Sequence, residues 1–435
     1  MNVGPSLVGD ARIQEAGGAM HAEMYPRAVE RLMADELLPV FPAVLVVGPR
    51  GCGKSTSMMR FADTTLDLSK PGDRLAARED PDGVLAISDG TVLVDKWQEA
   101  PEILGAIKRA VDADRSRRPG RFIVTGSVRA AQQAATWPGT GRLIRVRMHG
   151  LTQAELQRDE HYNPVDALFR LGHVQFGPSE WSRHDYLEAI TAGQFPVAVE
   201  LSGRNRRRWF SAYVDQLIDR DALPVSGRAP HIQKLRSVLE SCAARTGLEL
   251  NKRATADDVG IDFKTADRYL SLLEDLCVTS RVPAWHTKRL QRLTRSPKIH
   301  LADTGMAAHL LNVDATSVGR DPMLVGQMFE TFATNELSAH IETAQSETRM
   351  FHLRDRDGKE VDIVLESEGR IVGIEIKSSS VISHDDARGL MWLRDRVGDS
   401  FVGGAVLSSS SVPFQLNEHV WSLPLSALWR APLPR

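Results

Sequence analysis

A single nine-residue segment constrains the fold of this chain more than any other stretch. Residues 48–56 read GPRGCGKST and lie between an apolar run at 43–47 and a helical pattern at 57–62. The spacing G-x-x-x-x-G-K-[ST] of a phosphate-binding loop (P-loop) is filled by Gly48, Gly53, Lys54 and Ser55. A strand, a glycine-rich loop and a helix in this order predict an α/β nucleotide-binding domain, whereas the alternative is an ordinary glycine-rich turn.

The residue types of this loop suit phosphate chemistry. Glycines let successive backbone N–H groups turn toward phosphate oxygens, and the N-terminus of the following helix adds positive potential. We expect Lys54 to reach the β- and γ-phosphates and the Ser55 hydroxyl to ligate Mg²⁺. The loop as a whole is expected to hold ATP or ADP through Gly48, Pro49, Arg50, Gly51, Cys52, Gly53, Lys54, Ser55 and Thr56.

A second strand pattern, TVLVD, ends in Asp95. An acidic residue at this place downstream of a P-loop is expected to anchor Mg²⁺, and the alternative is a turn or helix-capping aspartate. The next residue is Lys96, where many P-loop ATPases place a glutamate that activates the hydrolytic water. A protonated lysine cannot act as that base. Either Glu99 substitutes for it, or hydrolysis is slow, or the nucleotide is bound without turnover.

Two further segments supply candidate residues for the same site. The strand pattern 121–127 ends in Thr125 and Ser127, which could sense the γ-phosphate or orient water, because the carboxyl ends of parallel strands face the ligand. They could equally end a buried strand in a simple turn. Arg142 precedes the strand pattern 143–147 and is a candidate arginine finger, acting in cis or on a neighbouring subunit. The second possibility would imply a homo-oligomer.

Four segments in this order resemble one protein family. The segments GPRGCGKST, TVLVDKWQEAPEIL, RFIVTGS and GRLIRVRMHGLTQAEL are similar to those of bacterial and archaeal AAA-type ATPases that carry a C-terminal domain of unknown function. The resemblance implies ATP and Mg²⁺ as cofactors, and a winged helix and a nuclease-like core after the ATPase domain. One departure is clear, since Asp95-Lys96 stands where the family has an Asp-Glu pair.

The middle of the chain predicts a winged-helix-like domain. Three consecutive helical patterns between 232 and 277 are joined through a glycine turn, and strands at 278–283 and 297–301 would form the wing. The wing is basic, which suits contact with DNA phosphates, although winged helices also serve as protein-interaction modules. The residues expected to contact DNA are Lys288, Arg289, Arg292, Arg295 and Lys298. An arginine-rich run at 204–210 is better explained as a solvated helix face.

The C-terminal region predicts a hairpin of strands 360–365 and 371–377. If the hairpin is symmetric about Glu368 and Gly369, Asp362 lies opposite Glu375. Like charges in this position destabilise a strand pair, and a divalent cation would convert them into a binding site. Period-two geometry places Lys377 on the same face as Glu375.

This arrangement resembles the restriction-endonuclease-like fold with its PD-(D/E)xK site. The resemblance implies that Asp362 and Glu375 bind metal, that Lys377 polarises the scissile phosphate or the water, and that Glu330 completes the metal shell. The alternative is an inherited fold that keeps a polar pocket and cleaves nothing.

Composition bounds these predictions. With 42% apolar residues, 25% charged residues and a net charge of −2, the chain is not suited to wholesale electrostatic capture of nucleic acid. Its three cysteines lack metal-ligand spacing, and no apolar run reaches membrane-spanning length, so we expect a cytoplasmic protein with no membrane contact. The expected α/β chain divides into a flexible extension (1–19), an AAA-type P-loop ATPase domain (20–155), a helical connector (156–230), a winged-helix-like domain (231–310) and a nuclease-like domain (320–435).

Two functional hypotheses follow from the sequence. The first is an ATP-binding AAA-type ATPase, associated with DNA, that couples its nucleotide state to a nuclease-like C-terminal domain. The second is a nucleotide-binding switch or assembly scaffold with little ATPase and no nuclease activity. Lys96 favours the second hypothesis, and the complete set of Asp362, Glu375 and Lys377 favours the first.

Overall fold

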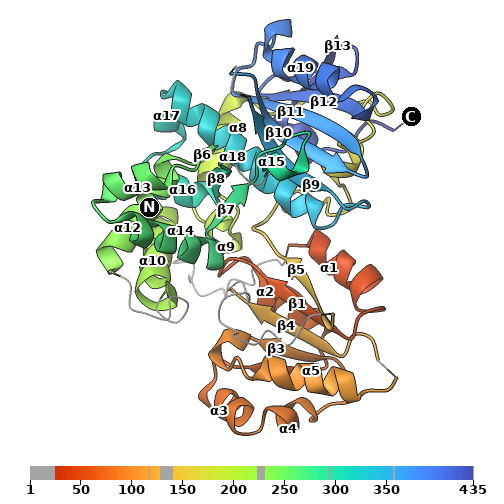
Figure 1. Cartoon of the computed structure of the whole chain (residues 1–435), viewed down its shortest axis with the longest axis vertical. Coiled ribbons are helices and arrows are strands. Elements are labelled where there is room, and N and C mark those ends of the chain that lie inside the picture. The colour runs from red at the N-terminus through yellow and green to blue at the C-terminus, as the bar shows by residue number, and fades with distance from the viewer. Residues whose placement is uncertain are drawn as a thin grey trace, which may run out of the picture.

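The structure is a computed structural model, and the chain forms three successive parts (Figure 1). They are an N-terminal parallel sheet with flanking helices, a helical middle region with a small sheet, and a C-terminal mixed sheet. The structure describes residues 25–116, 118–127, 141–222, 231–292, 295–355 and 358–434. The predicted extension 1–19 lies outside these ranges.

The N-terminal part contains a five-stranded parallel sheet in the order β2-β3-β4-β1-β5. Its strands are β1 (Ala43–Val47), β2 (Thr64–Asp67), β3 (Val92–Asp95), β4 (Phe122–Gly126) and β5 (Leu143–Arg147). Its helices are α1 (Ala28–Leu32), η1 (Met33–Leu37), α2 (Lys54–Met58), η2 (Met59–Phe61), α3 (Pro71–Glu79), α4 (Pro81–Leu85), η3 (Trp97–Glu99) and α5 (Ile103–Ala113). Four of the five strands match the sequence prediction. The strand β2 was not predicted, because its residues TTLD lack an apolar pattern.

Both faces of this sheet are buried, as expected for parallel strands. In β1, Val44 and Val46 pack into one apolar cluster together with Val29 of α1, while Leu45 packs into the other together with Ile107 of α5. All strands run in one direction, so the carboxyl ends of β1, β3 and β4 meet at one edge. That edge carries the P-loop and the polar residues that follow β3 and β4.

The middle region contains short helices and a three-stranded antiparallel sheet in the order β6-β8-β7. One helix of this region, α13, ends at Gly260 in the left-handed conformation, and Asp262 then caps the next helix, so the predicted glycine turn between two helices is present. Strands are present at both predicted places, as β7 (Thr279–Val282) and β8 (Lys298–Leu301). The other elements are α6 (Gln153–Leu156), α7 (Pro164–Leu168), α8 (Arg183–Ala192), α9 (Pro196–Glu200), α10 (Gly203–Gln216), η4 (Leu217–Asp221), α12 (Ile232–Ala244), β6 (Leu248–Glu249), α13 (Lys252–Val259), α14 (Phe263–Asp275), α15 (Arg289–Arg292), α16 (Thr304–Leu310) and α17 (Ala315–Val318).

The C-terminal part is a six-stranded mixed sheet in the order β13-β14-β12-β11-β10-β9. Its hairpin pairs Ile363 with Ile374, which confirms the predicted register, and the turn residues Glu368 and Gly369 both have positive φ. The elements are α18 (Pro322–Ile341), β9 (Arg349–Arg354), β10 (Glu360–Ser367), β11 (Arg370–Lys377), η5 (His384–Ala387), α19 (Arg388–Val397), η6 (Gly398–Ser400), β12 (Phe401–Ser408), β13 (Phe414–Asn417), β14 (Val420–Pro424) and η7 (Leu425–Leu428).

The long helix α18 connects the three parts. It lies near the centre of the molecule in Figure 1, and its buried residues belong to an apolar cluster that runs from β1 to the C-terminal sheet. Val44, Phe329 and Trp429 are members of that one cluster. Among the described residues, no helix is both long and apolar enough to span a membrane.

Candidate functional site: the P-loop edge and the C-terminal carboxylates

The P-loop passes close to the end of β5, and this proximity explains its first glycine. A Cβ atom on Gly48 would lie 2.0 Å from the carbonyl oxygen of Met148, so a side chain cannot be accommodated there. Gly51 and Gly53 have φ values of 78° and 101°, a region that residues with side chains rarely adopt. The loop therefore needs glycine at these three positions for steric and conformational reasons.

Lys54 begins α2 and is buried beneath the loop. Its Nζ atom donates hydrogen bonds to the carbonyl oxygens of Gly48 at 2.9 Å and Pro49 at 2.8 Å. The ammonium group thus spans the first turn of the loop. This position is suited to a lysine that exchanges backbone carbonyls for phosphate oxygens when a nucleotide binds.

Three predicted residues meet at the carboxyl edge of the sheet. The Ser55 hydroxyl donates to Asp95 Oδ1 at 2.7 Å, and the Thr125 hydroxyl donates to the same oxygen. The register pairs Asp95 with Thr125 across β3 and β4, so the sheet itself brings them together. A hydroxyl and a carboxylate are hard oxygen ligands, and Ser55 and Asp95 fit the donor set that would hold Mg²⁺.

Lys96 lies beside this cluster but does not resemble a catalytic base. Its backbone is left-handed with φ 61°, and its Nζ atom contacts Asp67 Oδ1 at 3.0 Å, Ser69 Oγ at 2.9 Å and Asp95 Oδ2 at 3.4 Å. Burial acts to lower the pKa of Lys96, but the hydrogen bond to Asp67 and the charges of Asp95 and Asp67 outweigh it and raise that pKa. The side chain therefore stays protonated and ties β2 to β3.

Glu99 does not join the cluster. It lies on η3, and its carboxylate pairs with Arg74 of α3 at 3.6 Å, while its backbone carbonyl accepts a hydrogen bond from Arg78. A carboxylate held by an arginine on a flanking helix is poorly placed to activate water at Asp95. The structure thus gives no support to Glu99 as a substitute base.

Gln98 is a candidate that the sequence prediction missed. Its amide Nε2 donates to Ser127 Oγ at 3.4 Å, and its buried Oε1 has no hydrogen-bond partner among the described residues. A Cβ on Gly126 would lie 2.9 Å from this Oε1 atom, so Gln98 packs directly against the end of β4. The available signal was its place three residues after Asp95, together with the ability of a glutamine amide to orient water.

Arg142 lies at the amino ends of the strands, whereas the P-loop lies at their carboxyl ends. It precedes β5, whose first residue pairs with Ala43 at the start of β1, and its guanidinium pairs with Asp112 at 2.8 Å. The prediction that Arg142 acts in cis is therefore wrong, because the P-loop follows the other end of β1. A role toward a neighbouring subunit stays a prediction.

Two of the three predicted metal carboxylates, Glu330 and Asp362, lie around a lysine. Lys298 of β8 is 3% exposed, and its Nζ atom lies 2.7 Å from Glu330, 3.1 Å from Glu360 and 3.5 Å from Asp362. Burial acts to lower the pKa of Lys298, but the three carboxylates outweigh it, so the pKa is raised. Burial and the neighbouring Asp362 raise the pKa of Glu330 to about 8.

The remaining members of the predicted nuclease-like site are also internally paired. Asp362 Oδ2 accepts the backbone N–H of Ile376 at 2.8 Å, and Glu375 pairs with Lys377 at 3.3 Å. Burial, followed by the charge of Asp362, raises the pKa of Glu375 well above its usual value. The described residues contain no group of three or more His, Cys, Asp or Glu arranged to hold a metal ion. Lys298 thus supplies positive charge next to Glu330 and Asp362, and metal binding by Glu330, Asp362 and Glu375 stays a prediction.

Three of the five basic residues predicted to contact DNA have partners within the chain. Arg292 pairs with Glu366 at 2.8 Å and lies over the rings of Trp285 and Phe351, while Arg295 donates to the carbonyl of Arg354. Lys298 is buried, as described above. Of the five residues expected to contact DNA, Arg292, Arg295 and Lys298 are turned to partners within the chain, and Lys288 is exposed.

The arginine-rich helix α10 contacts the P-loop through an aromatic residue. The Tyr213 hydroxyl donates to the carbonyl of Arg50 at 3.1 Å, and the Tyr213 ring stacks on Trp209. Contact between the middle region and the nucleotide loop was not predicted, since residues 163 positions apart give no periodic signal.

These features define a P-loop nucleotide-binding domain, and comparison with known families agrees. Residues 40–157 match an AAA domain, 183–317 match a domain of unknown function (DUF8612), and 325–428 match a second domain of unknown function (DUF4143). The chain thus carries an AAA-type P-loop ATPase domain followed by two domains of unknown function. At this level the resemblance seen in the sequence is confirmed.

Two curated relatives are homologous along most of the chain. They are the uncharacterized proteins Rv2008c of Mycobacterium tuberculosis and Mb2031c of Mycobacterium bovis, each 28% identical over 352 residues, which cover 79% of this chain and 71% of the relative. Among solved structures, the Walker-type ATPase PABY2304 of Pyrococcus abyssi is 14% identical, with a TM-score of 0.42, and the match covers 67% of this chain and 97% of that one. The RuvB Holliday junction branch migration motor of Thermotoga maritima is 17% identical, with a TM-score of 0.26, covering 58% and 87%.

Proposed function

We propose that this protein binds Mg²⁺-ATP at the P-loop and works as a nucleotide-dependent switch that hydrolyses ATP slowly. The observation that carries the proposal is the cluster of Ser55, Asp95 and Thr125 beside the buried Lys54. Mg²⁺ would be held by Ser55 and Asp95 and would supply charge neutralisation for the phosphates. Lys54 would bind the phosphates, and Thr125 would orient Asp95.

Slow hydrolysis follows from the groups that surround this cluster. Lys96 is protonated and paired with Asp67, and Glu99 is paired with Arg74, so neither supplies a free base. Gln98 remains to orient a water molecule through its buried amide. An amide can orient water but cannot accept its proton, and a switch with a long-lived ATP state suits this arrangement.

The proposal is tested by measuring ATP binding and ATP turnover for the native chain, for Lys54→Ala and for Lys96→Glu. We expect the native chain to bind ATP in the presence of Mg²⁺, Lys54→Ala to lose that binding, and Lys96→Glu to turn over ATP faster than the native chain. Equal ATP affinity in the native chain and Lys54→Ala would refute nucleotide binding at this loop. Fast native turnover that is unchanged in Lys96→Glu would refute slow hydrolysis.

A second candidate is a DNA-associated protein that couples its nucleotide state to a nuclease-like domain. In the middle region the elements from α12 to β8 are helix, strand, helix, helix, strand, the short helix α15 and strand, an order that favours a winged helix. The register of β10 and β11 favours the nuclease-like interpretation, because it brings Asp362 toward Glu375. Lys298 weighs against cleavage, since it neutralises the carboxylates that a metal would need.

This second candidate is separated from the first by two assays on the full chain. Nicking of plasmid DNA with Mg²⁺ or Mn²⁺ that is lost in Glu375→Ala would support the nuclease. Absence of nicking would refute the nuclease and leave the nucleotide-dependent switch as the remaining proposal. DNA binding that weakens with rising salt and with Lys288→Ala would support contact through the wing. Sedimentation with and without ATP would test the homo-oligomer in which Arg142 serves a neighbouring subunit.

A further inference from the structure

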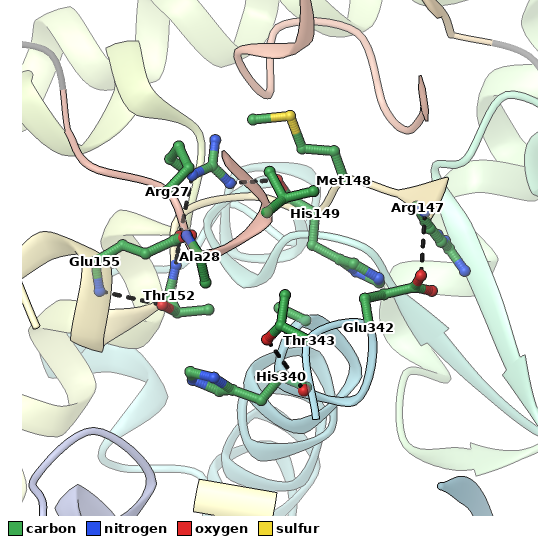
Figure 2. Close-up of a pocket in the computed structure, with 12 residues that line it drawn as sticks. Arg27, Ala28, Arg147, Met148, His149, Thr152, Glu155, His340, Glu342 and Thr343 are labelled. Carbon is green, nitrogen blue, oxygen red and sulfur yellow. Dashed lines mark hydrogen bonds and ion pairs between the residues drawn. The ribbon is translucent and has the colours of Figure 1, made fainter. Parts of the chain in front are cut away.

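Arg27 lies at the nucleotide loop although it precedes α1 and stands upstream of the residues that match the AAA domain. It is only 6% exposed, and its guanidinium is enclosed by the P-loop, the segment after β5 and helix α6. Figure 2 shows Arg27 between Glu155 and the backbone of His149, at the edge of a pocket that also borders the C-terminal end of α18. An arginine buried in this way has a specific set of partners.

Two guanidinium nitrogens of Arg27 donate hydrogen bonds, and the third lies beside a carboxylate. Nη1 donates to the carbonyl oxygen of Cys52 at 2.8 Å, and Nη2 donates to the carbonyl oxygens of His149 at 2.9 Å and Gly150 at 3.1 Å. Nε lies 3.1 Å from Glu155 Oε2, an ion pair by distance and charge that does not have the geometry of a hydrogen bond. The planar fork of an arginine can make these contacts at once, whereas the single ammonium of a lysine cannot.

The hydrogen bond from Arg27 to the Cys52 carbonyl fixes the orientation of the peptide group between Cys52 and Gly53. In a planar trans peptide the C=O and the N–H point in opposite directions. Because Arg27 holds the Cys52 carbonyl on its own side, the N–H of Gly53 is directed to the other side. Inward-pointing N–H groups of such a loop bind phosphate oxygens.

This peptide would otherwise rotate easily. Gly51 and Gly53 flank Cys52, and both have positive φ values that a glycine can exchange for others at little cost. A loop with two such hinges needs an external contact to keep one orientation. Arg27 supplies it, and Nη1 lies 3.3 Å from the position of a Cβ on Gly53.

Glu155 in turn holds Arg27. Its Oε2 pairs with Arg27 and accepts the N–H of Thr152, and its Oε1 accepts the N–H of Ala28. The carboxylate thus fixes both the arginine side chain and the start of α1. Glu155 is buried, so this support is not weakened by exchange with water.

We propose that Arg27 is a positioning residue of the nucleotide site, which turns the Gly53 N–H toward bound phosphates by holding the Cys52 carbonyl, with Glu155 holding Arg27. This inference rests on the proposed nucleotide binding at the same loop. Arg27 acts through the loop and does not itself touch the nucleotide. It adds a residue upstream of the segment that matches the AAA domain to the set that determines ATP affinity.

The test compares Arg27→Lys with Arg60→Lys. Lysine at position 27 keeps the charge beside Glu155 but cannot also hold the Cys52 carbonyl, so we expect ATP and ADP affinity to fall by roughly tenfold or more. Arg60 serves as the control, since it also pairs with a glutamate, Glu30 of α1, at 2.8 Å. Arg60→Lys is expected to bind ATP like the native chain. Affinity is measured by calorimetry, and the melting temperature of each chain is measured without nucleotide.

The outcomes separate the inference from the function on which it rests. A tenfold loss in Arg27→Lys, at a melting temperature equal to that of Arg60→Lys, supports the positioning role, since a merely structural residue would not change affinity alone. Native affinity in a folded Arg27→Lys would overturn the inference and leave the proposed function standing. Absence of ATP binding by the native chain would overturn both.

A second variant keeps the test decisive if Arg27→Lys does not fold. Glu155→Gln leaves one amide oxygen, which can accept only one of the two N–H groups of Ala28 and Thr152, and it removes the charge that holds Arg27. We expect ATP affinity to fall by a smaller factor than in Arg27→Lys, because Arg27 keeps its carbonyl partners. Unchanged affinity in a folded Glu155→Gln, with Arg27→Lys unfolded, would also overturn the inference.

Discussion

The ammonium group of Lys298 lies where the carboxylates of Glu330, Glu360 and Asp362 converge. The side chains of Glu330 and Asp362 are largely buried, and that of Glu360 is partly exposed. Carboxylates this close repel one another unless a cation neutralises them. A divalent metal and a lysine are alternative solutions to this problem. The structure uses the lysine, so the metal affinity of this site depends on one side chain.

Replacing Lys298 with methionine should expose that dependence. Removing one partner of a buried ion pair leaves unpaired charge, so we expect the free energy of unfolding to fall by about 3–5 kcal/mol. Mn²⁺ or Mg²⁺ should then raise the melting temperature of Lys298→Met and not that of the native chain. Lys288→Met, which changes an exposed lysine of the same segment, is the control. A Lys298→Met chain as stable as the native one would contradict the buried cluster.

Gln98 supports a second prediction at the level of one residue. Its amide is proposed to orient water, and its hydrogen bond within the described residues goes to Ser127 rather than to Lys54 or Ser55. Gln98→Ala should therefore leave ATP affinity unchanged and lower the turnover rate by roughly 10- to 100-fold, since one positioned group is lost. Steady-state turnover and calorimetric binding separate the two quantities. Equal losses of affinity and turnover would indicate a role in binding instead.

Residue-level prediction from the sequence worked where the partners are local. The P-loop residues form one continuous segment, and Asp95 follows a strand with a clear pattern, so their proximity follows from parallel-sheet geometry. The partners of Lys298 are 32 or more positions away, on a helix and a strand of another domain. No periodicity links them, and a lysine in a basic segment therefore looked like a DNA-contacting residue.

At the level of elements, Glu336 links α6 to α18. Both of its carboxylate oxygens accept the backbone N–H of Gln153, and Oε1 also accepts the side chain of Gln194. It is fully buried, and burial raises its pKa to about 8. A helix of the C-terminal part thus caps the first helix after the ATPase sheet.

The carboxyl group of Glu336 makes the free energy of unfolding depend on pH. Because folding raises its pKa above the usual 4.5, the folded chain binds the proton more tightly than the unfolded chain. Stability from this group is therefore complete below about pH 4.5 and is lost as the pH rises toward about 8. The loss should amount to a few kcal/mol, since one pKa unit corresponds to about 1.4 kcal/mol.

Glu336→Gln removes this contribution and keeps an oxygen acceptor for the Gln153 N–H. Urea unfolding of the variant should show a shallower fall in stability between about pH 5 and pH 8 than that of the native chain. A residual slope is expected from Glu330, whose pKa is also about 8. Identical slopes in the two chains would mean that Glu336 is ionised in the folded state.

At the level of elements, the sequence predicted the hairpin and the positions of β7 and β8 correctly. It did not predict the partners of the basic side chains in the segment that joins these two strands. The hairpin register was predictable because Glu-Gly between two alternating runs fixes the turn, and Glu368 and Gly369 adopt its positive φ values. The two wing strands were also located correctly. Their basic side chains were misjudged because Arg292 and Lys298 find their partners, Glu366 and Glu330, on the neighbouring domain.

At the scale of the whole molecule, the nucleotide loop is not isolated from the rest of the chain. Tyr213 of α10 bonds to Arg50, Glu342 follows α18 and accepts the backbone N–H of Arg147, and one apolar cluster extends from β1 to the C-terminal sheet. Contacts of this extent favour unfolding as one cooperative unit. Separate domains joined by sparse contacts would unfold independently.

Thermal unfolding in the presence of ATP tests this coupling. We expect one calorimetric transition for the native chain, and ATP with Mg²⁺ at a hundred times its Kd should add about 2.7 kcal/mol to the stability of that whole transition. Lys54→Ala should show the same single transition with no response to ATP. Two transitions, of which only one moves with ATP, would show that the C-terminal sheet does not sense the nucleotide. The switch would then be confined to the ATPase domain, because a ligand can stabilise only the unit that unfolds together with its site.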